Sequence, residues 1–143
     1  MKQIAIYMHN EEFEKAYGLS KDFLAKFPKE MMSHFFLAKS AFWLGKYEEC
    51  KAESQKAFNI ATDTNAMKMC AILGSSAHYQ LGEYGNGYKM LETVSKTMND
   101  GSVQQMLFIL AVAMKDRKKA IWHLDQIFAL NKEMTKELIA EFI

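Results

Sequence analysis

Residues 45–62 read GKYEECKAESQKAFNIAT, and this stretch decides the fold because a similar pattern occurs three more times. The related stretches are EEFEKAYGLSKDFLAKFP at 11–28, GEYGNGYKMLETVSKTMN at 82–99 and KDRKKAIWHLDQIFALNK at 115–132. Successive copies are offset by 34, 37 and 33 residues. A nearly constant offset of this size is the signature of a repeat protein. We therefore expect about four similar units, each of which packs on its neighbours.

Each copy keeps a small residue at one place and an apolar residue seven positions later. The small residues are Ala16, Cys50, Gly87 and Ala120. The apolar residues are Phe23, Ala57, Val94 and Ile127. A spacing of seven returns a side chain to the same face of an α-helix, and a small side chain lets a second helix approach closely. The residues expected to pack the repeats together are Ala16, Tyr47, Cys50, Ala57, Tyr84, Gly87 and Ala120.

A second helical stretch precedes the last three copies, whereas the first copy follows only a short stretch at 2–8. These leading stretches cover roughly residues 30–44, 65–81 and 102–114. Helix caps and turn formers, such as Gly45, Asp63 and Gly82, separate the helical stretches. The chain has a single proline and no alternating run of strand length. The sequence therefore predicts an all-α protein built from pairs of helices.

The order of an apolar helix, a Leu-Gly-Lys-Tyr turn, a small residue and a second apolar helix resembles the tetratricopeptide repeat (TPR). The residues of the second repeat that carry the resemblance are Leu37, Ala38, Gly45, Tyr47, Cys50 and Ala57. The other repeats contribute Tyr7, Phe13, Ala16, Pro28, Gly82, Tyr84, Gly87, Leu107, Ala120 and Ile127. The resemblance covers nearly the whole chain.

This resemblance implies a right-handed α-α superhelix, a solenoid of antiparallel helix pairs with about three and a half to four repeats. Stacked helix pairs bury one another's apolar faces, so several repeats together make one stable unit. We expect a single domain over 1–143, with a C-terminal helix over 133–143. The expected repeats cover approximately 1–29, 30–63, 64–100 and 101–132.

The resemblance also implies that the leading helices line a concave groove. The leading stretch MMSHFFLAKSAFWLG at 31–45 is apolar nearly all round, so it must be covered on more than one side. The expected groove residues are Met32, Phe35, Lys39, Phe42, Trp43, Met69, Ile72, Tyr79 and Ile109. Methionine and aromatic side chains suit an apolar helix or an extended peptide. We therefore expect a protein-interaction scaffold without catalytic activity, as a subunit or fragment of a larger assembly.

Three other interpretations of these residues stay open at this point. The same side chains can be ordinary core between repeats, or they can form a face that joins two copies in a homodimer. A small-molecule sensor is a more remote hypothesis, which needs polar groups that converge near Lys39, His78 and Tyr79. Because TPR proteins serve many unrelated binding roles, the fold alone does not name the partner.

Charge and hydropathy argue against several partners. The chain has 18 Lys and Arg against 17 Asp and Glu, a net charge of +1, which gives no electrostatic footprint for nucleic acid or an anionic membrane. The one basic run, KDRKK at 115–119, reads as a solvated turn or as a contact with an acidic partner. No apolar run has the length of a membrane span, and MKQIAIYMHNEEF lacks a signal-peptide layout. We expect a cytoplasmic protein, with a nuclear location as the alternative.

The sequence carries no catalytic or metal-binding motif. It contains no phosphate-binding glycine loop, no HExxH, no CxxC and no calcium-binding loop. The four histidines lie in different elements and have no i, i+4 pairing, so they predict no metal site. Cys50 and Cys70 lie within apolar helical patterns and read as small buried residues rather than as a redox pair. We therefore expect no cofactor.

Overall fold

A computed structural model describes residues 1–130, 136–137 and 139–141. Residues 1–130 form eight α-helices, and none of the described residues is in a strand. The helices are α1 (Lys2–His9), α2 (Phe13–Lys26), α3 (Met31–Trp43), α4 (Tyr47–Ile60), α5 (Thr64–Gln80), α6 (Tyr84–Ser95), α7 (Gly101–Ala113) and α8 (Arg117–Leu130). The terminal helix expected over 133–143 lies largely outside the described residues.

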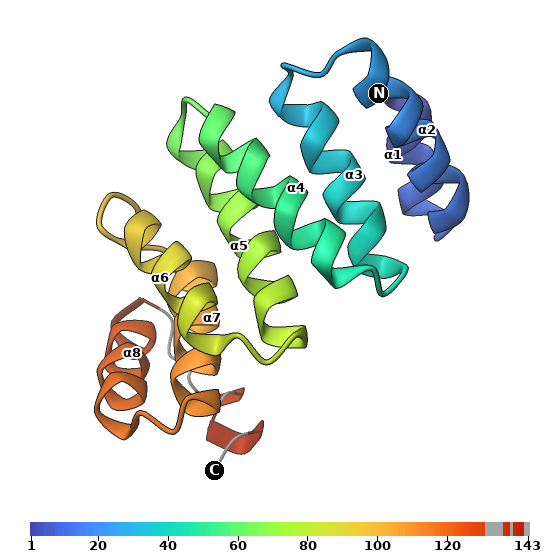
Figure 1. Cartoon of the computed structure of the whole chain (residues 1–143). Helices are drawn as coiled ribbons and strands as arrows, with labels where there is room; N and C mark the ends of the chain where they lie inside the picture. The colour runs from blue at the N-terminus through green and yellow to red at the C-terminus, as the bar shows by residue number, and fades with distance from the viewer. Residues whose placement is uncertain (131–135, 138, 142–143) are drawn as a thin grey trace.

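The helices stack in chain order along one direction, as Figure 1 shows. Each helix packs against the next, and the leading helix α5 also contacts the leading helices α3 and α7 on either side of it. Helix α1 packs on α2 but has no contact of similar extent with α3. The all-α solenoid of helix pairs predicted from the sequence is confirmed.

The turn inside each helix pair has the same geometry four times. A backbone N–H just beyond the leading helix donates to a carbonyl five residues earlier, as in the bond from Lys46 to Ala41 at 2.8 Å. The equivalent bonds are Glu12 to Tyr7 at 2.8 Å, Glu83 to His78 at 2.8 Å and Asp116 to Ala111 at 3.0 Å. The residue before each donor has a positive φ: Glu11 (59°), Gly45 (77°), Gly82 (75°) and Lys115 (60°). Such a left-handed residue closes a helix by satisfying its last carbonyls.

Aspartates begin two of the leading helices. The Asp63 carboxylate accepts a hydrogen bond from the Ala66 N–H at 2.8 Å, and Asp100 accepts one from Val103 at 3.0 Å. Each bond satisfies a donor that the first helical turn leaves without a partner. Asp100 also pairs with Lys68 of α5 at 2.9 Å, which ties the start of α7 to the preceding repeat.

Small residues lie where helices come closest. Ala16, Cys50 and Ala57 are fully buried. A Cβ atom added at Gly87 would lie 3.1 Å from His78 Cβ and 3.3 Å from the Ser75 carbonyl oxygen, so α6 rests directly on α5. The other expected packing residues, Tyr47, Tyr84 and Ala120, are half-buried. This close approach is what the recurring small position in the sequence predicted.

Candidate partner-binding groove

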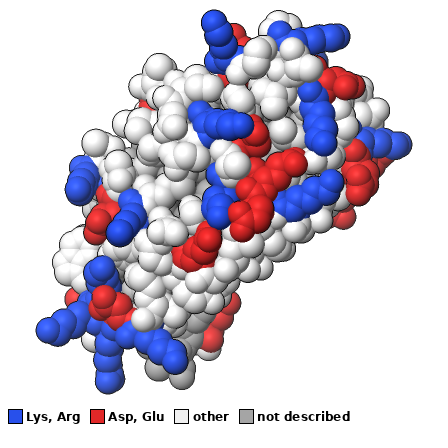
Figure 2. All heavy atoms as spheres, viewed as in Figure 1, with Lys and Arg blue, Asp and Glu red and all other residues white. Residues whose placement is uncertain are grey.

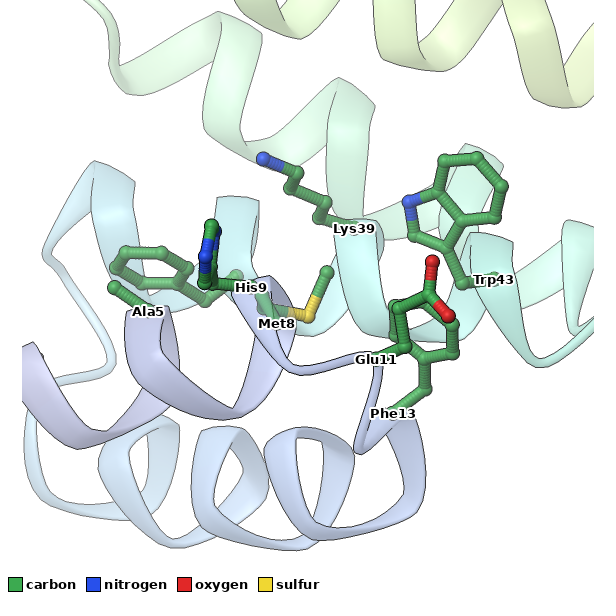
Figure 3. A pocket seen from close by; sticks show the side chains of 8 residues that line it. Ala5, Met8, His9, Glu11, Phe13, Lys39 and Trp43 are labelled. Carbon is green, nitrogen blue, oxygen red and sulfur yellow. The ribbon is translucent and has the colours of Figure 1, made fainter.

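The first of two neighbouring hollows lies between α1 and α3 and has a volume of about 490 Å³. Figure 3 shows Lys39 and Trp43 extending from α3, opposite Met8 and His9 of α1. The residues that line this hollow are Ala5, Met8, His9, Glu11, Phe13, Phe36, Lys39 and Trp43. Its size falls within the range of roughly 300–1,000 Å³ that is usual for ligand pockets.

The second hollow lies between α3 and α5 and has a volume of about 390 Å³. Its lining residues are Phe35, Lys39, Phe42, Trp43, Lys68, Met69, Ile72, Leu73 and Ser76. On α5 the spacing of 69, 72, 73 and 76 keeps these side chains on one helix face. Lys39 and Trp43, one turn apart on α3, line both hollows. We call the two hollows together the α1–α3–α5 groove.

Trp43 forms an aromatic platform in this groove. Its ring stacks on Phe13 with centroids 5.6 Å apart and an interplanar angle of 13°. Phe42 meets the same ring edge-on at 5.5 Å. These contacts hold the indole in place, yet 56% of Trp43 is exposed. Met69, across the second hollow, is 41% exposed.

The charges around the groove are unevenly neutralised. Lys39 has no carboxylate within ion-pair distance among the described residues, whereas Lys68 pairs with Asp100. Of the residues that the structure describes, no acidic one lines the second hollow, and Glu11 is the acidic one that lines the first. On the face drawn in Figure 2, acidic and basic side chains are interspersed, and basic ones gather at the α8 end.

The structure brings six of the nine expected groove residues together. They are Phe35, Lys39, Phe42, Trp43, Met69 and Ile72, all around the second hollow. Phe35 is at its floor and only 7% exposed. These residues of α3 and α5 lie around one hollow because the two helices contact each other.

The other three expected residues, Met32, Tyr79 and Ile109, line neither of these two hollows. Met32 is half-buried and packs against the cluster of Phe35, Ala57 and Cys70. The Tyr79 ring packs on Tyr84 with centroids 5.5 Å apart, at the turn between α5 and α6. Ile109 packs on the cluster that Phe108 and Ile127 form between α7 and α8. All three side chains are half-buried by these contacts.

Sequence reasoning missed the contribution of α1. Ala5 and Met8 line the first hollow, as does Phe36 on the α3 side. Ala5 and Met8 are three residues apart and so share a helix face, which is a weak signal in a helix of eight residues. Phe36 lies one position from Phe35, and only the packing of α3 shows that both face hollows.

The remaining reactive side chains form no catalytic or metal centre in the part of the chain that the structure describes. Burial raises the pKa of the Cys50 and Cys70 thiols to about 11, so both stay protonated at neutral pH. Burial lowers the pKa of His123 to about 4. No group of three or more His, Cys, Asp or Glu among the described residues is placed to hold a metal ion. Nor is any described helix both long and apolar enough to cross a bilayer.

These features define a TPR-like helical repeat protein whose leading helices carry an apolar groove. A similar solved structure is the MamA RS-1 ArsTM double mutant, from a TPR protein, with a TM-score of 0.81 and 14% identity. The match covers 92% of this chain and 73% of that one. At this identity the likeness establishes the fold alone.

A second solved structure, described as "YrrB: a TPR protein with an unusual peptide-binding site", matches 98% of this chain and 89% of that one. Its identity is 11% and its TM-score is 0.46. No family model matches the sequence, and no curated protein matches it significantly.

Proposed function

We propose that this protein is an interaction scaffold that holds a segment of a partner protein in the α1–α3–α5 groove and catalyses no reaction. The observation that carries the proposal is the pair of exposed apolar side chains in the groove, Trp43 and Met69. Apolar surface in contact with water is unfavourable by roughly 25 cal/mol per Å², and an occupant removes that cost.

The chemistry of the lining supports a protein or peptide partner. Tryptophan is among the residues that contribute most to protein interfaces, and the stack with Phe13 keeps the Trp43 ring ordered before binding. Methionine adapts its shape to different apolar surfaces. An apolar peptide, helical or extended, therefore fits this groove better than a polar ligand does.

The polar lining residues support a binding role rather than a catalytic one. The groove offers two lysines, one histidine, one serine and one glutamate. Ser76 donates its hydroxyl proton to the Ile72 carbonyl at 2.7 Å, so it is engaged in its own helix. A nucleophile would need an adjacent base in hydrogen-bond reach, and among the described residues the Ser76 hydroxyl bonds only to the Ile72 carbonyl oxygen.

A matched pair of tryptophan variants tests the proposal. A library of random linear peptides displayed on phage is selected on the wild-type protein, and the enriched peptides are synthesised and measured by fluorescence anisotropy. Trp43→Glu is expected to weaken their binding at least tenfold. Trp122→Glu, at an equally exposed tryptophan (55%) on α8, is expected to leave binding unchanged. Equal losses in both variants, or no enriched peptide, would contradict the proposal.

Self-association is a second candidate, and a separate observation favours it. Ile121 and Trp122 are both more than half exposed on adjacent positions of α8. Such a patch can join two copies of the chain. Light scattering over a range of micromolar concentrations measures the mass directly. A dimer that Trp122→Glu dissociates supports this function, whereas a monomer at every concentration removes it.

A further inference from the structure

The gap between α1 and α3 interrupts an otherwise continuous row of leading helices. Helices α3 and α5 contact each other, as do α5 and α7. Helix α1 packs against α2 and does not make a contact of comparable extent with α3. The space that results is the first hollow, whose walls carry Ala5, Met8 and Phe36. The hollow, which His9, Glu11 and Lys39 also line, has room for a bulky apolar side chain against these walls.

Lys39 lies at the boundary between the two hollows. It is half-buried, it lines both, and it has no carboxylate partner among the described residues. An apolar occupant that covered the groove would also cover this ammonium group and remove its water. Glu11, the acidic residue of the first hollow, is exposed and forms no ion pair with Lys39. A buried charge without a partner is strongly unfavourable, so we expect an occupant that covers this ammonium group to supply an acceptor of its own.

The spacing of the helices limits how the occupant is built. Packed helix axes lie about 8–10 Å apart, and α1 and α3 contact each other less closely than packed helices do, so the centres of the two hollows on either side of α3 are about 10 Å or slightly more apart. An extended chain rises about 3.3 Å per residue, so roughly three residues separate side chains that enter the two hollows. The acceptor for Lys39 then lies between these two positions.

From these three steps we propose a specific occupant, which rests on the function proposed above. The occupant is a protein segment with two large apolar side chains about three residues apart and an acidic residue between them. One apolar side chain fills the first hollow and the other covers Met69 and Ile72. The acidic side chain pairs with the Lys39 ammonium group.

The test compares peptides selected on proteins that differ in one charge. The random phage library is selected in parallel on the wild-type protein, on Lys39→Glu and on Lys89→Glu. Lys89 is an exposed lysine of α6 outside the groove, so its reversal makes the same change in net charge. We expect the peptides selected on the wild-type protein and on Lys89→Glu to carry Asp or Glu between two apolar residues. We expect the peptides selected on Lys39→Glu to carry Lys or Arg between the two apolar residues instead.

Synthetic peptides then measure the contact itself. Exchange of the acidic residue for its amide is expected to weaken binding to the wild-type protein about tenfold, as for a charge-assisted hydrogen bond, and to leave binding to Lys39→Met unchanged. Enriched peptides that lose binding with Trp43→Glu or Met69→Glu but show no acidic preference would overturn this inference and leave the proposed function standing. Peptides that are insensitive to both groove variants would overturn both. Circular dichroism melts verify that each variant is folded.

Discussion

His34 of α3 and Glu53 of α4 form a buried pair with 2.6 Å between Nδ1 and Oε2. His34 Nε2 lies 2.8 Å from the Pro28 carbonyl oxygen, which only accepts, so Nε2 donates there and Nδ1 faces the Glu53 carboxyl group. In the last repeat, Gln104 and His123 occupy the same two positions relative to the left-handed turn residue, which is Gly45 for the first pair and Lys115 for the second. They are also in contact, with 2.7 Å between His123 Nδ1 and Gln104 Oε1. The intervening repeat has Ala71 and Met90 there, both in apolar packing. These two positions of the repeat thus carry an ionisable pair, an apolar pair or a neutral polar pair.

Removal of one member of this pair is expected to destabilise the protein. Glu53→Ala leaves the buried His34 ring without its partner, at a cost of about 2–3 kcal/mol in the free energy of unfolding. Glu53→Gln is expected to cost less, because the amide N–H can donate to Nδ1. Urea denaturation followed by circular dichroism measures both values.

The repeat itself supplies the control for this prediction. The double variant His34→Ala and Glu53→Met installs the residues found at 71 and 90, and it is expected to recover most of the stability that Glu53→Ala loses. Glu48→Ala, at a largely exposed carboxylate, is expected to change stability by no more than about 0.5 kcal/mol. A double variant no more stable than Glu53→Ala would show that the pair is required for more than charge neutralisation.

Substitutions at the left-handed turn residues are expected to change the stability of the protein in opposite directions. Glu11 and Lys115 adopt a φ near 60°, where a Cβ atom is crowded, whereas Gly45 and Gly82 adopt similar values without that strain. Glu11→Gly and Lys115→Gly are therefore each expected to stabilise the protein by about 0.5–1 kcal/mol. Gly45→Ala is expected to destabilise it by about 1 kcal/mol. Thermal melts report both signs.

Gly18 provides the matched control because it lies inside α2 with nothing within 4 Å of an added Cβ. Gly18→Ala is expected to stabilise the protein by up to about 1 kcal/mol through helix propensity. The same exchange of glycine for alanine thus has opposite effects at 18 and at 45. Equal effects at the two positions would refute the assignment of strain to the turn.

His123 predicts a loss of stability in mild acid. Its ring accepts a hydrogen bond from the Tyr88 hydroxyl at 2.6 Å and donates to Gln104, so the folded state holds it neutral. Burial lowers its pKa to about 4, below the usual value of about 6.5, so the unfolded chain binds the proton first as pH falls. The contribution is therefore complete above about pH 6.5 and lost as pH falls toward 4, by about 2–3 kcal/mol.

A variant separates this effect from the titration of other groups. His123→Gln keeps an acceptor for Tyr88 and a donor for Gln104 but cannot be protonated in this range. Urea denaturation from pH 7.5 to 4.5 measures the unfolding free energy of both proteins. As pH falls, the wild type is expected to lose more of its unfolding free energy than the variant does. Parallel curves would mean that His123 does not couple to folding.

The sequence predicted the helix pairs because their determinants are local. A small residue recurs along the sequence at positions 16, 50, 87 and 120, and a turn glycine recurs at Gly45 and Gly82. The helix predicted over 30–44, for example, is Met31–Trp43 in the structure. Turn chemistry and helix periodicity act over a few residues, so a reader of the sequence can see them.

The groove was only partly predictable because it depends on distances between helices. Met32 and Phe42 have the same apolar signal on α3, yet Met32 packs against a core cluster and Phe42 lines the second hollow. Nor does any local pattern show that α1 contacts α2 and leaves a gap beside α3. Which apolar residues stay uncovered is a property of the assembled stack.

Phe42 and Trp43 are adjacent in sequence and are expected to respond differently to the same substitution. Phe42 packs edge-on against Tyr47 at 5.4 Å and lies with the Leu37, Ala41 and Cys50 cluster, so Phe42→Glu is expected to destabilise the protein by about 3 kcal/mol or more. Trp43→Glu loses chiefly the stack on Phe13, about 1 kcal/mol. Urea denaturation measures the two losses, and peptide anisotropy measures binding by the variants that remain folded. If Trp43→Glu proved as destabilising as Phe42→Glu, the indole would be a core residue, and the exposed platform on which the groove depends would not exist.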